Sequence, residues 1–183
     1  IPNEAISMLR QAAFEGETAL LKGCLHCPTT RSDGKGTPEE VIAMHAQHGY
    51  DFLALTDHRT YNYKDYLPES GVLIIPGMEF DRTITNHHRV HCFHTVWIGP
   101  EKPENPYEQD QPFQRGYVQD QYEFQQFLDE AHRNKQLTIY CHPQWSGTFA
   151  REFERLQVNF AMELWNSVCG MEDGVDFNNG HLW

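Results

Sequence analysis

The sequence predicts a single α/β domain built on a largely parallel sheet. Short apolar runs alternate with segments of helical spacing from residue 19 onward, and this alternation is typical of strand–helix–strand units. Several runs are apolar without interruption, which indicates strands covered on both faces, as in parallel sheets and barrels. The length of 183 residues fits one domain, so we expect one unit over residues 1–183.

The apolar runs define the expected strands. Each run has the length of a strand, and several of them stop at a polar residue that could serve as a ligand. The runs cover residues 19–27, 52–56, 72–76, 90–98, 137–141 and 160–165.

The clearest helix signal follows the first expected strand. Thr37 can cap a helix, Pro38 suits the first helical position, and Glu40 completes a capping box. We expect this helix to end near His48, because Gly49 favours termination.

Two other segments carry apolar residues at helical spacing and predict helices over residues 3–14 and 119–133. Residues 100–117 are rich in Pro, Gln, Glu and Asp and have no period, so we expect a long surface loop there.

The acidic composition excludes some partners. The formal net charge is −12, whereas wrapping nucleic acid requires a basic face, so nucleic acid is not an expected partner. A small anionic substrate remains compatible if metal cations supply positive charge locally. No apolar stretch has the length of a membrane span, and no leader segment is visible. We expect a soluble protein; a cytoplasmic location and export after leader removal both stay open, as does the oligomeric state.

The five cysteines form an odd set, and most lie in or beside apolar runs. This pattern favours reduced core thiols over a disulfide framework. Cys24 and Cys27 form a C-x-x-C, but no second pair follows to complete a zinc site. We interpret the pair as structural thiols, with metal or redox use as the alternative.

Histidine is the compositional outlier, with 11 residues in the chain. His26, His58, Glu79 and His142 each follow or end an apolar run, and in a parallel barrel such strand ends converge on one face. Any one histidine alone could be a surface or core residue, but the set predicts a metal site. Imidazole and carboxylate donors suit zinc, manganese or iron, and Glu79 could bridge two ions.

The order of these residues resembles the motifs of PHP (polymerase and histidinol phosphatase) domains. The similarity spans Lys22 to about Asn166 and opens with an L-H-x-x-[ST]-x-x-S-D-G string that leads to an L-T-D-H strand end. The matching segments are residues 25–34, 38–40, 49–58, 77–79, 94–99 and 141–143.

The resemblance implies a distorted (β/α)7 barrel with one to three divalent ions, zinc, manganese or iron. It implies hydrolysis of a small phosphorylated substrate by a metal-bound hydroxide, with Glu79, Asp33 and His58 as catalytic residues. Arg82, Arg89 and Asn166 are the candidates for substrate contact. The implied metal ligands are His26, Asp33, His58, Glu79, His94 and His142, with Glu79 as the bridge.

The sequence departs from the family pattern twice. Pro28 stands where the opening motif has a second histidine, and no Asp-x-His motif follows Asn166, so we expect a barrel incomplete at its C-terminal part. We therefore expect one well-formed metal site, from Glu79, His94 and His142, and weaker sites elsewhere. Two alternatives stay open: a non-catalytic PHP-like scaffold, and a metal hydrolase of another ester or an amide.

Overall fold

The structure is a computed structural model that describes residues 19–84, 91–100, 116–148, 150–157 and 159–173. The helix expected over residues 3–14 and most of the loop expected over 100–117 lie outside the described residues. Among the described residues, none of the helices has both the length and the apolarity to cross a bilayer.

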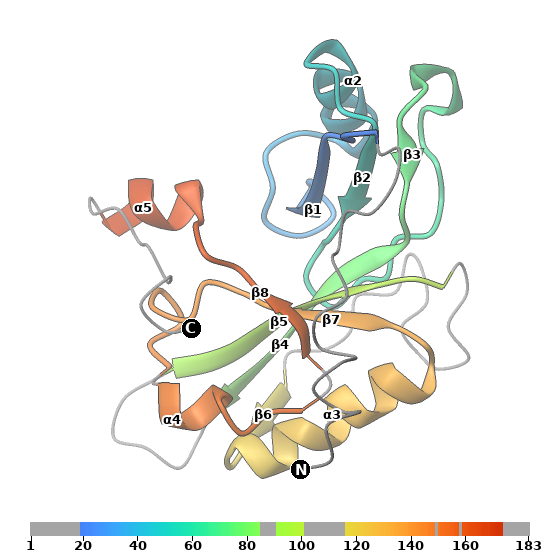
Figure 1. Cartoon of the computed structure of the whole chain (residues 1–183). Coiled ribbons are helices and arrows are strands. Elements are labelled where there is room, and N and C mark those ends of the chain that lie inside the picture. The colour runs from blue at the N-terminus through green and yellow to red at the C-terminus, as the bar shows by residue number, and fades with distance from the viewer. Residues whose placement is uncertain (1–18, 85–90, 101–115, 149, 158, 174–183) are drawn as a thin grey trace.

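A three-stranded parallel sheet forms the first part of the fold (Figure 1). Its strands are β1 (Gly23–Cys27), β2 (Phe52–Leu55) and β3 (Leu73–Ile74), in the order β1-β2-β3. Helix α2 (Pro38–Gln47) connects β1 to β2, and a short 3-10 helix (Pro68–Ser70) precedes β3. The predicted parallel pairing is confirmed for this sheet.

Helix α2 begins as the sequence predicts. The Thr37 hydroxyl accepts a hydrogen bond from the Glu40 backbone N–H at 3.2 Å, and the Glu40 carboxylate accepts one from the Thr37 N–H at 2.9 Å. This capping box is confirmed. Val41 and Ile42 on the inner face of α2 pack with Leu53 of β2, so the apolar stripe fixes the helix against the sheet.

A five-stranded mixed sheet forms the second part, with the order β6-β4-β5-β7-β8. The strand β4 pairs antiparallel with β5, and β5 pairs antiparallel with β7. The expectation of a largely parallel sheet is wrong here, because residues 85–90 are too short a link for the crossover that parallel neighbours require. The bounds are β4 Gly77–Ile84, β5 His91–Ile98, β6 Gly116–Val118, β7 Leu137–Tyr140 and β8 Asn159–Met162.

Helix α3 (Gln121–Arg133) covers one face of the mixed sheet (Figure 1). The buried rings of Phe80, Phe93 and Phe124 form the core between them. Strand β4 thus turns Phe80 toward α3 and Glu79 toward the three-stranded sheet, as the alternation of a strand requires. Two short helices, α4 (Ala150–Phe153) and α5 (Ser167–Asp173), were not predicted.

The two sheets meet at the end of β2. The Glu79 N–H donates to the Asp57 carbonyl at 3.1 Å, and the Arg59 N–H donates to the Glu79 carbonyl at 2.8 Å. Within the described part of the chain, β1 and β8 are edge strands that pair only with β2 and β7. The expected barrel is therefore not closed in these residues, and the fold is a mixed α/β arrangement of two joined sheets.

Candidate metal centre

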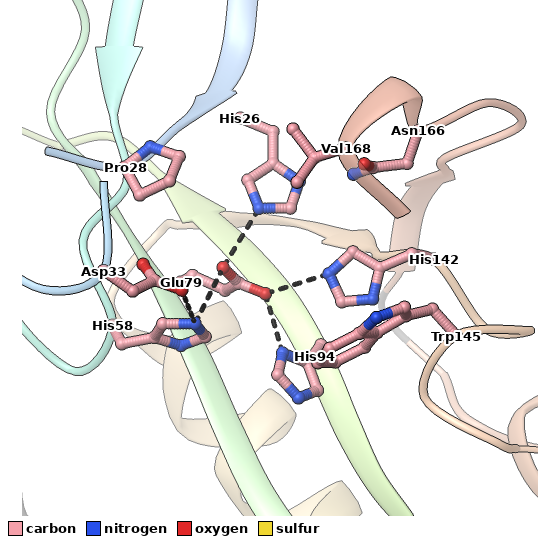
Figure 2. Close-up of a pocket in the computed structure, with 10 residues that line it drawn as sticks. All are labelled: His26, Pro28, Asp33, His58, Glu79, His94, His142, Trp145, Asn166 and Val168. Carbon is pink, nitrogen blue, oxygen red and sulfur yellow. Dashed lines mark hydrogen bonds and ion pairs between the residues drawn. The ribbon is translucent and has the colours of Figure 1, made fainter. Parts of the chain in front are cut away.

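The six residues predicted as metal ligands line one pocket at the junction of the two sheets (Figure 2). Pro28, Trp145 and Asn166 line it as well. The strands β1, β2, β4, β5 and β7 or the loops after them supply these ligands, so residues far apart in sequence meet. The six are His26, Asp33, His58, Glu79, His94 and His142.

Glu79 lies at the centre of the pocket, with histidines around both carboxylate oxygens (Figure 2). Oε1 is 2.7 Å from His94 Nδ1 and 3.2 Å from His142 Nε2. Oε2 is 3.0 Å from His26 Nε2 and 3.5 Å from His58 Nε2. The expected position of Glu79 at a strand end is wrong, because β4 begins at Gly77 and Glu79 lies inside it.

The charges in this pocket support one another. Burial raises the pKa of Glu79, but the charge of His26 and hydrogen bonds from His142, His26 and His94 outweigh it and hold that pKa well below the usual range. Burial lowers the pKa of His58, yet hydrogen bonds to Asp33 and Asp81 and the charge of Glu79 raise it to about 10. Burial likewise lowers the pKa of His26, and the charge of Glu79 reverses this and raises it well above normal. A carboxylate so deeply buried requires cations beside it.

Asp81 orients His58 and was missed from the sequence. Asp81 Oδ1 is 2.9 Å from His58 Nδ1 and also pairs with Arg59, so Nε2 of the imidazole faces the pocket. Asp81 lies two positions after Glu79 on the same strand, and this alternation is the signal that could have revealed it.

Asp57 holds the loop that carries Asp33. Its buried carboxylate accepts hydrogen bonds from the Thr29 N–H at 2.7 Å, the Ser32 hydroxyl at 3.0 Å and the Asn62 amide at 2.8 Å. Asp33 itself is 64% exposed in its side chain and lies 3.4 Å from His58 Nε2. The loop therefore holds Asp33 at the open side of the pocket.

Glu163 is a further carboxylate beside the pocket, in contact with its His26, and the sequence analysis missed it. Its Oε1 is 3.1 Å from His26 Nδ1, and its Oε2 accepts a hydrogen bond from the His142 backbone N–H at 3.0 Å. Burial raises the pKa of Glu163, but hydrogen bonding and charge from His26 lower it overall, so it stays ionised. The signal was an acidic residue within the apolar run over residues 160–165.

Besides a set of His26, Glu79 and Cys141 that overlaps both, the donors form two compact groups that share no residue with each other. We call them the Glu79 group (His58, Glu79 and His94) and the Glu163 group (His26, His142 and Glu163). Within each group, one donor atom per residue lies within 4.8 Å of the others. Each group offers two imidazoles and one carboxylate, a donor set that suits zinc, manganese or iron. The grouping differs from the expected set of Glu79, His94 and His142, although His142 still contacts Glu79.

The three residues expected to bind substrate have different outcomes. Asn166 lines the pocket, where its amide donates to both Glu163 oxygens at 3.1 and 3.2 Å. Arg82 lies on the other face of β4, with its guanidinium 4.1 Å from the Phe80 ring centre and 4.6 Å from that of Phe127. Strand alternation turns Arg82 toward α3, so its position does not favour the expected contact with substrate. Arg89 lies outside the described residues.

Comparisons with known proteins give the fold. No protein-family model and no curated protein sequence matches the chain. A candidate metal-dependent phosphoesterase from Bifidobacterium adolescentis matches in structure with 10% identity and a TM-score of 0.54, over 87% of this chain and 86% of that one. An amidohydrolase from Chromobacterium violaceum matches with 15% identity and a TM-score of 0.55, over 86% and 84%.

A two-domain protein from Bacteroides vulgatus, which contains a predicted PHP-like metal-dependent phosphoesterase, also matches. Its identity is 17% and its TM-score 0.43, over 84% of this chain and 42% of that one. The chain thus matches the structures of a candidate metal-dependent phosphoesterase and of an amidohydrolase over most of its length. At the level of fold, the resemblance stated from the motifs is confirmed.

Proposed function

We propose that this chain is a metal-dependent phosphoesterase that hydrolyses a small phosphorylated molecule. The observation that carries the proposal is one buried carboxylate, Glu79, with four imidazole nitrogens within 3.5 Å of its oxygens. Such a carboxylate can bridge two ions, and paired ions are a common means of phosphoester hydrolysis.

The Glu79 group and the Glu163 group are the proposed metal ligands, with Asp33 as an additional donor at the pocket mouth. Zinc, manganese or iron, when bound there, supplies positive charge for the phosphoryl oxygens and lowers the pKa of water. No Lys or Arg is among the described residues that line the pocket, so the charge of a phosphate depends on these ions for compensation.

The protein residues orient the ligands and move protons. Asp81 fixes the ring of His58, and Ser146 Oγ, 3.1 Å from His142 Nδ1, does the same for His142. A hydrogen bond from His58 outweighs desolvation and lowers the pKa of Asp33, so its carboxylate is ionised. Most of its side chain is open to solvent. Its place at the open side of the pocket, 3.4 Å from His58 Nε2, makes Asp33 the proposed acceptor of a proton from the attacking water.

A second candidate is hydrolysis of an amide or of a non-phosphate ester. The structural match to the Chromobacterium violaceum amidohydrolase favours it, because the same scaffold could hold either chemistry. A third reading, a metal-free scaffold, takes its motivation from Pro28 at the pocket wall.

One experiment separates the three. The purified protein is stripped with chelator, reloaded with manganese, zinc or iron, and assayed on an aryl phosphate, an aryl phosphodiester and an aryl amide. We expect metal-stimulated cleavage of a phosphate ester that is lost in Glu79→Ala, with Arg82→Met as the control that retains turnover. Normal turnover by Glu79→Ala would refute the proposal, and cleavage of the amide alone would establish the second candidate. Failure to retain any metal by elemental analysis would establish the scaffold.

A further inference from the structure

Cys24, Cys27 and His45 form a cluster outside the pocket, between β1 and α2. In a regular strand, residues three apart point to opposite faces. The pairing of β1 with β2 shifts register between Cys24 and Cys27, and both side chains pack with the apolar cluster beneath α2. The irregularity of the strand thus turns both thiols to the same side, while His26 between them faces the pocket.

His45 brings an imidazole to these thiols from α2. It is buried, and its Nδ1 donates to the Val41 carbonyl at 2.8 Å. A carbonyl can only accept, so the hydrogen is on Nδ1, and in the neutral ring Nε2 keeps its lone pair. This is the tautomer in which a histidine binds a metal, with its other nitrogen held by a backbone carbonyl.

The three donor atoms are already close together. The two Sγ atoms and the His45 ring nitrogen all lie within 4.8 Å of one another. In a tetrahedral zinc site with bonds of about 2.3 Å to sulfur and 2.0 Å to nitrogen, neighbouring ligand atoms lie about 3.5–3.8 Å apart. The donor atoms would need to move by a fraction of an ångström to about one ångström to surround an ion, and rotation of the thiol side chains can supply this movement.

We propose that Cys24, Cys27 and His45 bind a thiophilic divalent cation, zinc in class, at a site separate from the metal centre of the pocket. Two thiolates and one imidazole are a donor set that proteins use for zinc with the fourth position open. A cavity lined by Lys22, His48 and Tyr50 reaches His45, the imidazole ligand of this site. The ion ties β1 to α2 and thereby steadies the strand that carries His26.

Cobalt(II) tests the site, because thiolate ligands give it a charge-transfer band in the near ultraviolet that imidazole and carboxylate ligands do not. Reduced, metal-free protein is titrated with cobalt and then with zinc. We expect the band to appear with one equivalent of cobalt, to vanish when zinc displaces it, and to be absent from Cys24→Ser/Cys27→Ser. It persists in Glu79→Gln, which disables the pocket, so this test does not depend on the proposed hydrolase activity.

Two controls exclude other thiols. Cys141 lies within 4.8 Å of donor atoms of His26 and Glu79, so Cys141→Ser must keep the band if the assignment is correct. In the unmutated protein, zinc should also protect Cys24 and Cys27 from alkylation, measured by mass spectrometry, and chelator should remove that protection. Absence of the band and of protection, a band that survives in the double variant, or loss of the band in Cys141→Ser would each overturn the proposal.

Discussion

The Glu79 group and the Glu163 group have the same composition, two histidines and one carboxylate, but different surroundings. The Glu79 side chain is 3% exposed and contacts four histidines, whereas that of Glu163 is 16% exposed and contacts His26 and the backbone of His142. Glu79 therefore connects both groups, and Glu163 belongs to one. Equal donor sets therefore need not have equal roles. Glu79 is suited to be a bridging ligand between two ions, whereas Glu163 is suited to be a terminal ligand of one ion.

The largest expected effect comes from Glu79→Gln. The amide removes the negative charge that all four histidines share, so we expect both groups to lose most of their metal. Loss of several kcal/mol of transition-state stabilisation corresponds to a decrease in kcat/KM of about 10³-fold. Elemental analysis and steady-state kinetics measure both. A variant that keeps two ions would contradict the bridging role of Glu79.

Glu163→Gln should affect one group alone. The amide still accepts the hydrogen bond from the His142 N–H, so the backbone is retained while the charged ligand is lost. We expect metal affinity at one site to fall about 10- to 100-fold, with the other ion retained. Competitive titration with a fluorescent chelator resolves the two sites. Equal loss at both sites would mean that the two groups act as one.

Metal binding should release protons. His58, with a pKa raised to about 10, and His26, whose pKa is raised well above normal, are both protonated at neutral pH in the metal-free protein, and a metal requires their neutral forms. Affinity should therefore rise with pH, by at most about 100-fold per pH unit if both protons leave. Calorimetry in buffers of different ionisation enthalpy counts the protons, with His48→Gln as the control. A metal affinity that does not change between about pH 6 and 8 would contradict the expected rise of affinity with pH.

Pro28→His should strengthen the centre. Pro28 lines the pocket next to the strand that carries His26, and an imidazole there would add a donor where proline offers none. We expect the affinity for metal at the site next to His26 to increase by up to about 10-fold. The control is Pro28→Ala, which removes the proline ring as Pro28→His does but adds no ligand. If both variants behave alike, Pro28 does not limit metal binding.

The smallest expected effect on activity is that of Arg82→Met. The guanidinium donates to the Asp81 carbonyl at 2.8 Å and packs on Phe80 and Phe127, away from the pocket. We expect a loss of about 1–2 kcal/mol in the free energy of unfolding, with KM unchanged. Urea denaturation and kinetics test the two parts separately. A raised KM would restore Arg82 as a substrate residue.

Sequence predicted the part of the site that depends on neighbouring parallel strands. His26 follows from β1 and His58 from β2, and because these strands are parallel neighbours their carboxyl ends meet at one edge. The capping box of α2 was equally visible, because its three signals are local in sequence. Motif order located His94 and His142.

The rest of the site depends on how the strands pair and on local irregularities within them. Neither feature can be recognised in a single sequence. Asp81 on β4 and Glu163 just after β8 left only weak signals in the sequence, because an apolar run does not reveal which face of its strand turns toward the site. The C-x-x-C appeared to lack partners because its third donor, His45, is on a helix, and because two cysteines three apart share a face only after a register shift. The antiparallel pairing of β4 with β5 was missed because residues 77–84 were not among the expected strands.

The alternation of β4 has a consequence for folding fidelity. Glu79 pairs with Val96 and Phe80 with Thr95 across the strands. A slip of one residue would turn Phe80 into the pocket and bury Glu79 beneath α3, so the same error would spoil the chemistry and the core together. Only molecules in which β4 pairs with β5 in the correct register would hold metal. Metal retention would therefore distinguish correctly folded molecules from those with a shifted register.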